Sequence, residues 1–266
     1  MIRLIVTDVD DTLVPESSMD LNPEYFEVIR KLQEKGVMFV AASGRQKTSI
    51  KKVFAPIRDE IAYLADNGTD ICTKDFSQTM KFADGDYPKL AKELESLSDR
   101  GFTYMPSKPD WNYIDEKEQE FYELTLSYGC QIKTVPDLKV LDGITKVSLY
   151  HPDGIPKDLE NRLKAEWSDH MDVCIAGRVY LDFTGKNCNK GRALSILQEH
   201  YGITYDETAA FGNADNDIFL LERAKYSYAV GNASENLKRA ASETIGRMDE
   251  DAVLAKLKEI LAELES

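Results

Sequence analysis

The sequence predicts an α/β fold, in which a parallel-sheet core is interrupted by an inserted α+β domain. Three observations predict this fold. Short apolar strands alternate with helices near both ends of the chain, polar loops follow the carboxyl ends of those strands, and the alternation breaks in the middle. Open parallel sheets bind ligands at the carboxyl ends of their strands, so the polar loops indicate where a functional site should lie.

The first part of the core is predicted from alternating strands and helices. An apolar run over residues 2–7 precedes an acid cluster, which is typical of a strand that ends at a polar loop. A helix follows, with Asn22 as its cap, Pro23 in its first turn and Gly36 at its end. The remaining segments are a strand at 37–42, a helix that ends near residue 54, and a strand at 61–64.

The middle of the chain has a different character. Residues 83–183 hold both tryptophans and six of the nine prolines, and they mix helical and extended patterns without regular alternation. We therefore expect an inserted α+β domain there. Its predicted helices cover about 87–99, 116–128 and 156–168, and its predicted strands about 102–105, 144–150, 171–175 and 178–183.

The core resumes after the insertion, so it is expected to comprise residues 1–82 and 184–266. The predicted segments are a helix at about 189–200, a strand at 208–211, a helix from 216, a strand at 226–230 and a closing helix from about 250. The return of strand–helix alternation indicates that both parts contribute to one sheet.

The composition limits the possible partners. The 266 residues carry a net charge of −14, which disfavours binding to a nucleic-acid backbone. We find no apolar run of about 18 residues, no charged-then-apolar leader and no C-x-x-C pair among the four cysteines. We therefore expect a cytoplasmic enzyme that acts on a small molecule, without nucleic-acid or membrane partners, as a monomer or a homodimer.

The most informative feature is the acid cluster at the end of the first strand, Asp8-Val9-Asp10-Asp11-Thr12. Two carboxylates 4 Å apart repel each other by about 4 kcal/mol at an effective dielectric constant of about 20. A nearby cation or a shifted protonation state has to offset this repulsion. By itself the cluster fits either an inert acidic turn or a catalytic carboxylate pair.

Three further polar clusters lie at predicted strand ends or helix starts. They are Ser43-Gly44-Arg45, Asn189-Lys190-Gly191 and Gly212-Asn213-Ala214-Asp215-Asn216-Asp217. If one sheet brings them to the acid cluster, they supply a hydroxyl, an ammonium group and more oxygen ligands. This set suits phosphoryl transfer, because a phosphate dianion needs cationic and N–H donors before a carboxylate can approach it. Hard oxygen ligands also suit Mg²⁺.

The order of these clusters resembles the haloacid dehalogenase (HAD) superfamily, specifically the Cof-type phosphatases of subclass IIB. Asp8 to Thr12 match the family's D-x-D-G-T motif, and Ser43 to Arg45 match the second motif. Lys190 to Leu194 match K-G-x-A-L, and residues 211–218 are similar to F-G-D-x-x-N-D-I. Gly231 to Ala233 match the G-N-A signature. The resemblance implies a Rossmann-like parallel-sheet core (the HAD fold) with an α/β cap domain for substrate specificity at 83–183.

Two positions depart from the family pattern. Asp11 replaces the usual glycine, and Asn213 stands where the family usually has a Mg²⁺-binding aspartate. An amide oxygen can coordinate Mg²⁺ but brings no charge, so we expect a weaker metal affinity. Asp215 and Asp217 are candidates to compensate.

The resemblance implies a role for each matched residue. Asp8 would attack phosphorus and form an aspartyl-phosphate, and Asp10 would act as general acid and then as general base. Lys190 would neutralise phosphate charge and hold Asp8. The phosphate- or substrate-binding residues would be Thr12, Ser43, Gly44, Lys190 and Asn216, and the Mg²⁺-binding residues would be Asp8, Asp10, Asn213 and Asp217.

Several of these residues also have a purely structural interpretation. Ser43 fits a helix cap, a role compatible with phosphate binding at the same helix start. Lys190 fits a solvated helix residue, and Asp217 an ordinary acid in a first helical turn. For the basic residues Arg45, Lys47, Lys51 and Lys52 we expect a solvated face rather than a substrate site.

The expected function is that of a Mg²⁺-dependent phosphatase acting on a small phosphorylated metabolite. A sugar phosphate is favoured by the resemblance alone. One alternative is a phosphotransferase or phosphomutase that passes the same phosphoryl group to a sugar hydroxyl. A second is a phosphometabolite-binding protein weakened in catalysis by Asn213. A phospho-receiver domain is a third, disfavoured because such domains are much shorter and lack a large insertion.

Overall fold

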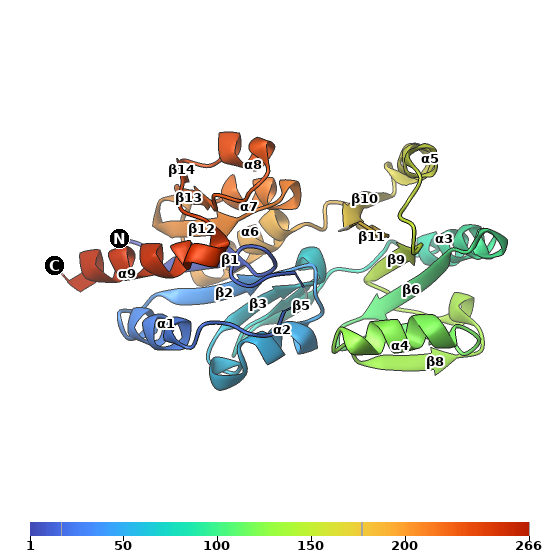
Figure 1. Cartoon of the computed structure of the whole chain (residues 1–266), viewed down its shortest axis with the longest axis horizontal. Coiled ribbons are helices and arrows are strands. Elements are labelled where there is room, and N and C mark those ends of the chain that lie inside the picture. Colours follow the sequence, from blue (N-terminus) through green and yellow to red (C-terminus); the bar gives the residue numbers. More distant parts are fainter. Residues whose placement is uncertain (17, 177, 266) are drawn as a thin grey trace. The chain divides into compact units, whose positions relative to one another are not determined.

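The computed structural model describes residues 1–16, 18–176 and 178–265. The chain divides into two compact units, drawn together in Figure 1. We call Met1–Gln78 with Asn189–Ser266 the core unit, and Thr79–Cys188 the inserted unit. The sequence placed the insertion at 83–183, so the inserted unit takes in a few more residues at each end. Within the described ranges, no helix is long and apolar enough to cross a membrane.

The core unit is built on a mostly parallel sheet with strand order β14-β13-β12-β1-β2-β3-β4-β5. Its strands are β1 (Leu4–Asp8), β2 (Met38–Ala42), β3 (Ala62–Ala65), β4 (Asp70–Cys72), β5 (Ser77–Thr79), β12 (Thr208–Gly212), β13 (Tyr226–Ala229) and β14 (Glu243–Thr244). β1 pairs in parallel with both β2 and β12, so the two chain segments of the core share one sheet. The predicted α/β fold class is therefore confirmed.

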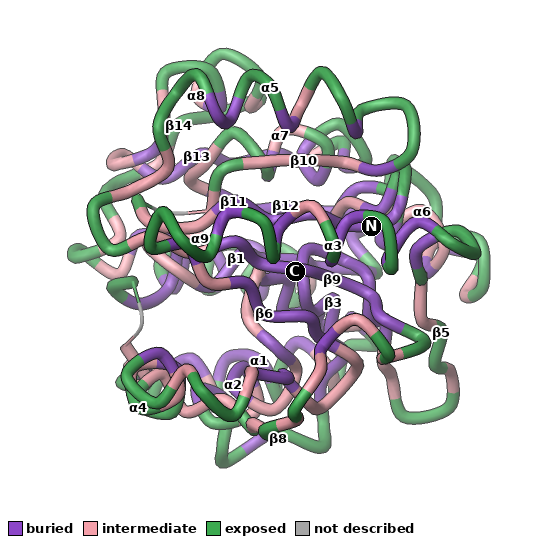
Figure 2. Tube along the Cα trace, turned by 90° about the vertical axis from the view of Figure 1, so that its right-hand side faces the viewer, coloured by how far each residue is buried: buried purple, intermediate pink, exposed green. Residues whose placement is uncertain are grey.

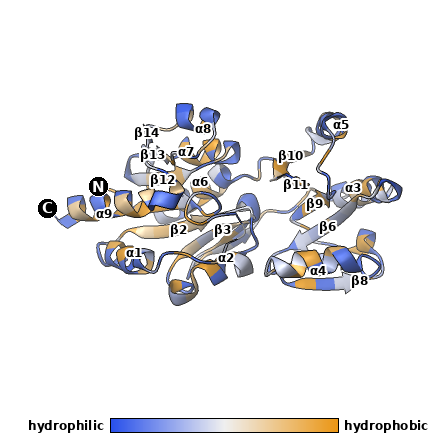
Figure 3. Cartoon of the chain, in the orientation of Figure 1, coloured by the Kyte–Doolittle hydropathy of each residue, from blue (hydrophilic) through white to orange (hydrophobic). Residues whose placement is uncertain are grey.

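The central strands are buried because helices cover the sheet. All of Leu4–Asp8 is buried, and so is β2 except for Met38. Apolar runs without alternation are typical of strands covered on both faces. β2 is drawn in the hydrophobic colours of Figure 3, and β1 and β12 in the buried colour of Figure 2.

The helices of the core unit pack in neighbouring pairs. They are α1 (Glu24–Glu34), α2 (Lys47–Val53), α6 (Lys190–Tyr201), α7 (Ile218–Leu221), α8 (Glu235–Ala240) and α9 (Ala252–Glu265). α1 packs against α9 and α6 against α7. Asn22 acts at the start of α1 as predicted, because its Oδ1 accepts a hydrogen bond from the N–H of Glu24 at 3.1 Å.

The inserted unit has its own sheet, with strand order β10-β11-β9-β6-β7-β8. The strands are β6 (Thr103–Lys108), β7 (Trp111–Asp115), β8 (Ile132–Val135), β9 (Lys146–Tyr150), β10 (Met171–Ala176) and β11 (Tyr180–Gly185), and the helices are α3 (Asp86–Glu95), α4 (Gln119–Ser127) and α5 (Lys157–Trp167). α3 and α5 pack on the sheet through one apolar cluster that includes Leu90, Leu163 and Phe183. The α+β character predicted for the insertion is present.

The strands that the sequence did not reveal are β4, β5, β7, β8 and β14. Most of them lie at or near a sheet edge. β5, β8 and β14 contain no buried residue. A strand without a buried face needs no apolar pattern, so its sequence carries little signal.

Candidate active site

The site lies at the carboxyl ends of three adjacent strands of the core unit. Asp8 is the last residue of β1 and is in register with Ala42, which directly precedes Ser43. β12 ends at Gly212, where the fourth polar cluster begins. Because the three strands are parallel neighbours, the loops that follow them meet at one edge.

Asp8 is buried, and both oxygens of its carboxylate are hydrogen-bonded. Lys190 Nζ donates to Oδ1 at 2.5 Å, and the Thr12 hydroxyl donates to Oδ2 at 3.1 Å. Burial, and after it the negative charge of Asp217, raise the pKa of Asp8 to about 7, although the ammonium group of Lys190 opposes the rise. Burial is thus the main reason that the ionised form of Asp8 is disfavoured, and Lys190 only partly compensates for it.

Lys190 begins α6 and lies between two carboxylates. Its ammonium group donates to Asp8 Oδ1 and, at 2.7 Å, to Asp217 Oδ1. Only 2% of Lys190 is exposed, so the interpretation as a solvated helix residue is wrong. Burial opposes the charged form, but the carboxylates of Asp217 and Asp8 outweigh it and raise the pKa of Lys190. Lys190 thus stays a cation beside Asp8.

Asp217 holds Lys190 and the loop after β12 in place. Its Oδ1 accepts from Lys190, and its Oδ2 accepts from the N–H groups of Asn213 and Ala214 at 3.1 and 3.2 Å. Asp217 is completely buried. It lies in the site as predicted, but these contacts suit a residue that orients Lys190 better than a metal ligand.

Asp215 was the other residue expected to compensate for the carboxylate that is missing at position 213. Its side chain is hydrogen-bonded to the start of α8. Its Oδ1 accepts from the Ser234 hydroxyl at 2.5 Å, and its Oδ2 accepts from Asn236 Nδ2 at 2.8 Å. Ser234 also donates its N–H to the carbonyl oxygen of Asn213 at 2.8 Å. The start of α8 therefore fixes the loop on which Asn213 and Asp215 lie.

Asp10 forms an ion pair with Arg45. Arg45 Nε donates to Asp10 Oδ2 at 2.9 Å and Nη2 donates to Oδ1 at 2.5 Å, while the Ser43 hydroxyl donates to Oδ2 at 3.3 Å. The Arg45 side chain is only 11% exposed. The predicted solvated basic face is therefore wrong for Arg45, because β1 and β2 end side by side and bring it to Asp10. Lys47 likewise pairs with buried Asp70 at 3.0 Å.

The predicted phosphate-binding residues lie around the same loops. Ser43 is buried, and its hydroxyl oxygen accepts from the N–H of Arg45 at 3.0 Å. Asn216 Nδ2 approaches Oδ1 of Asn67 at 3.5 Å. Sequence reasoning placed neither Asn67 nor Arg45 among the functional residues of the site. The available signal was their position, since each lies in a polar segment directly after a strand.

The oxygen ligands that follow β1 and β12 fit a hard cation. They are the carboxylate of Asp8, the main-chain carbonyl oxygen of Asp10 and the side-chain amide oxygen of Asn213. In the described part of the chain, no group of three His, Cys, Asp or Glu side chains could hold a metal, so an amide or a carbonyl oxygen has to complete the set. A cation here would favour the ionised form of Asp8, whose pKa is raised by burial and by the charge of Asp217. The residues therefore fit Mg²⁺.

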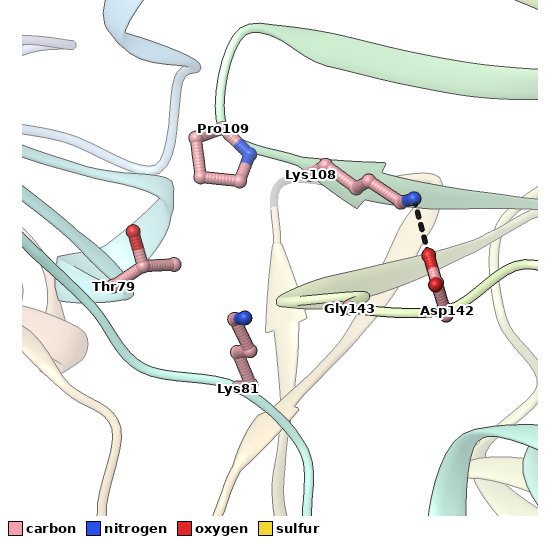
Figure 4. Close-up of a pocket in the computed structure, with 6 residues that line it drawn as sticks. All are labelled: Thr79, Lys81, Lys108, Pro109, Asp142 and Gly143. Carbon is pink, nitrogen blue, oxygen red and sulfur yellow. Dashed lines mark hydrogen bonds and ion pairs between the residues drawn. The ribbon is translucent and has the colours of Figure 1, made fainter.

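A separate hollow of about 510 Å³ lies within the inserted unit (Figure 4). It is lined by Thr79, Lys81, Lys108, Pro109, Asp142 and Gly143. Lys108 donates to Asp142 at 2.8 Å, the pair drawn with a dashed line. None of the predicted site residues lines this hollow, so it is not the candidate active site.

Comparisons with known proteins agree on one family. The chain matches a family model described as haloacid dehalogenase-like hydrolase over residues 5–257. It is 25% identical to 5-amino-6-(5-phospho-D-ribitylamino)uracil phosphatase YbjI of Escherichia coli, over 98% of this chain and 96% of that protein. It is 26% identical to HMP-PP phosphatase of Yersinia enterocolitica, over 95% of this chain and 93% of the relative. A crystal structure from Eubacterium rectale has a TM-score of 0.87 and 34% identity, covering 97% of this chain and 99% of that one.

Proposed function

The chain belongs to the haloacid dehalogenase-like hydrolase family, as its motifs predicted, and from this premise we propose that it is a Mg²⁺-dependent phosphatase that uses Asp8 as nucleophile. The observation that carries the proposal is the buried chain Asp8–Lys190–Asp217, with ammonium-to-carboxylate distances of 2.5 and 2.7 Å. Burying a cation between two carboxylates costs desolvation free energy. Such a cation is useful where a carboxylate has to meet a phosphate dianion.

In the first half-reaction, a carboxylate oxygen of Asp8 forms a bond to phosphorus while the bond from phosphorus to the ester oxygen breaks. The products are an aspartyl-phosphate and an alkoxide, and the carboxyl group of Asp10 gives its proton to the alkoxide. Lys190 offsets the charge on the phosphoryl oxygens. Thr12, hydrogen-bonded to Asp8 Oδ2 at 3.1 Å, orients the attacking carboxylate.

In the second half-reaction, water attacks the phosphorus and the bond to Asp8 breaks, which releases inorganic phosphate. The carboxylate of Asp10 takes the proton from water. The geometry prepares Asp10 for this role as a base, because Arg45 and Ser43 hold its two oxygens in a fixed direction.

Mg²⁺, when bound, would screen the repulsion between the Asp8 carboxylate and the phosphate. Asp8, Asp10 and Asn213 are the residues that we propose would hold it, with Asp217 acting on Lys190 instead. Ser43, Gly44 and Asn216 would bind the phosphate oxygens. This set has one carboxylate fewer than the family pattern, because Asn213 replaces an aspartate.

We favour a phosphorylated sugar or sugar alcohol as the substrate. The support comes from the family and from the phosphoribityl compound named for the Escherichia coli relative. The inserted unit would supply the specificity for the rest of the substrate.

The proposal is tested with a panel of sugar phosphates and p-nitrophenyl phosphate in the presence of Mg²⁺. We expect release of inorganic phosphate, and we expect Asp8→Asn to abolish it. Asp11→Asn is the matched control, because it makes the same change three residues away at a side chain outside the proposed chemistry. Phosphate that appears only on a sugar acceptor would identify a transferase, and full activity of Asp8→Asn would rule out Asp8 as the nucleophile.

A further inference from the structure

We propose that Asn67 is a positioning residue of the active site, whose side-chain amide sets the orientation of Asn216 and of the loop at Gly44. The inference rests on the phosphatase function proposed above and extends it to a residue outside the motifs. The evidence is a set of contacts within the core unit. They join the turn after β3 to the loop after β2, to the start of α6 and to Asn216.

The turn at Asp66-Asn67-Gly68 has an unusual backbone. All three residues are left-handed, with φ values of 49°, 58° and 94°. The left-handed backbone conformation costs free energy for residues other than glycine, and here two such residues adopt it in succession. Backbone strain of this kind persists where the surrounding structure imposes it, commonly near functional sites. All three residues are buried.

The backbone of this turn is bonded to the loop that follows β2. The N–H of Asn67 donates to the carbonyl oxygen of Ser43 at 3.0 Å, and the N–H of Asp66 donates to that of Arg45 at 2.9 Å. These two bonds bracket Gly44. The turn therefore fixes the loop that presents Ser43 and Arg45 to Asp10.

The turn also lies against the start of α6. A Cβ atom on Gly68 would come within 2.7 Å of the carbonyl oxygen of Asn189 and 2.9 Å of Ala193 Cβ, so only glycine fits there. Asn189 caps α6 by accepting from the N–H of Arg192 at 2.9 Å. Because Lys190 follows Asn189 directly, the turn contributes to the placement of the lysine.

The Asn67 amide itself lies between two proposed phosphate-binding residues. Its Oδ1 is 3.5 Å from Asn216 Nδ2, the length of a long hydrogen bond. The same Oδ1 is 3.2 Å from the place where a Cβ on Gly44 would be. The amide therefore occupies the space beside Gly44 and approaches Asn216 through the same oxygen.

The residue type supports a role for the side chain. Glycine adopts a φ of 58° without steric cost, whereas asparagine is tolerated there only with some strain. A turn that served the backbone alone would be better built with glycine. Asparagine adds an amide that meets Asn216 and Gly44.

The first test is Asn67→Gly, which keeps the left-handed backbone accessible and removes only the amide. We expect KM for p-nitrophenyl phosphate and the inhibition constant for inorganic phosphate each to rise about tenfold, the loss expected from one positioning hydrogen bond. We expect kcat to stay within about threefold. A purely structural role would lower the melting temperature instead and leave both constants unchanged.

Asp251→Gly is the matched control. Asp251 is also left-handed, with φ of 53°, and lies in the core unit, where its carboxylate accepts from Asn22 rather than from any site residue. We expect wild-type KM and phosphate inhibition for this variant. The comparison removes the general effect of placing a glycine at a left-handed position.

The second test is a double-mutant cycle with Gly44→Ala. The new methyl group would press on the Asn67 amide, since all three of the nearest atoms belong to that amide. We expect Gly44→Ala to raise KM in the wild type and to have a much smaller effect in the Asn67→Gly background. Equal effects in both backgrounds would overturn the inference.

The two proposals fail in different ways. If the wild type releases no phosphate from any substrate, the proposed function is wrong. If the wild type is active and Asn67→Gly has wild-type KM and phosphate inhibition, the function stands and the role of Asn67 is overturned.

Discussion

Arg45 holds the carboxylate of Asp10 through two nitrogen atoms, with Nε at 2.9 Å from Oδ2 and Nη2 at 2.5 Å from Oδ1. The two residues follow neighbouring parallel strands, and Ser43 adds a third contact to the same carboxylate. A bidentate arginine fixes both the position and the plane of a carboxylate. Asp10 therefore has a defined direction before any substrate binds.

Arg45→Lys keeps the charge but removes the bidentate contact. We expect kcat for phosphate release to fall by about 10²-fold, because a catalytic group displaced by about 1 Å loses that much. Steady-state assays and thermal melting measure the effect, and the melting temperature should stay within a few degrees. Arg58→Lys is the control, since Arg58 is exposed and pairs with exposed Asp59. An unchanged kcat in Arg45→Lys would contradict this role.

Lys190→Met leaves two buried carboxylates without their common partner. Removing one member of a buried ion pair costs about 3–5 kcal/mol, so we expect a loss of that size in the free energy of unfolding at pH 8 without metal. Urea denaturation measures it. Lys225→Met removes an exposed pair with Asp206 and should cost less than about 1 kcal/mol. Equal losses in the two variants would show that Lys190 is not paired as described.

Asp8 links stability to pH. Its pKa of about 7 in the folded protein lies above the ordinary value of 3.8, so the folded state binds the proton more tightly than the unfolded state. This group therefore favours folding at low pH, and the contribution is lost as the pH rises from about 4 through about 7. We expect Asp8→Asn to stabilise the metal-free protein by about 2 kcal/mol at pH 8 and to have little effect at pH 4. Urea unfolding at both pH values measures this effect. An equal gain in the free energy of unfolding at pH 4 and pH 8 would contradict the raised pKa of Asp8.

Asn213→Asp restores a carboxylate to the proposed metal site. We expect the Mg²⁺ concentration for half-maximal activity to fall about tenfold, because a charged ligand binds a hard cation more strongly than an amide does. Isothermal titration with Mg²⁺ gives an independent measure of affinity. Asn161→Asp adds the same charge at an exposed position of the inserted unit and should change neither value. If Asn213→Asp behaves like this control, Asn213 is not a metal ligand.

The order of the central elements could be predicted because their signals are local. β1 and β2 are continuous apolar runs, and α1 has one buried stripe and a cap at Asn22. The edge strands β5, β8 and β14 were missed, since they bury no residue and need no apolar pattern, whereas the edge strand β10 was predicted. The family followed from the motifs, and the family model matched over residues 5–257 confirms it.

The sequence by itself determined which chemical groups follow which strands, because apolar runs and the polar clusters after them are local patterns in the sequence. Only the tertiary structure decided how those groups pair. Arg45 pairs with Asp10, which is 35 residues away in the sequence. Lys190 pairs with Asp8, 182 residues away, and with Asp217, 27 residues away. Such pairings depend on which strands are neighbours, how they are registered and how far each side chain is buried. Those quantities arise only when the sheet forms and brings the strand ends to one edge.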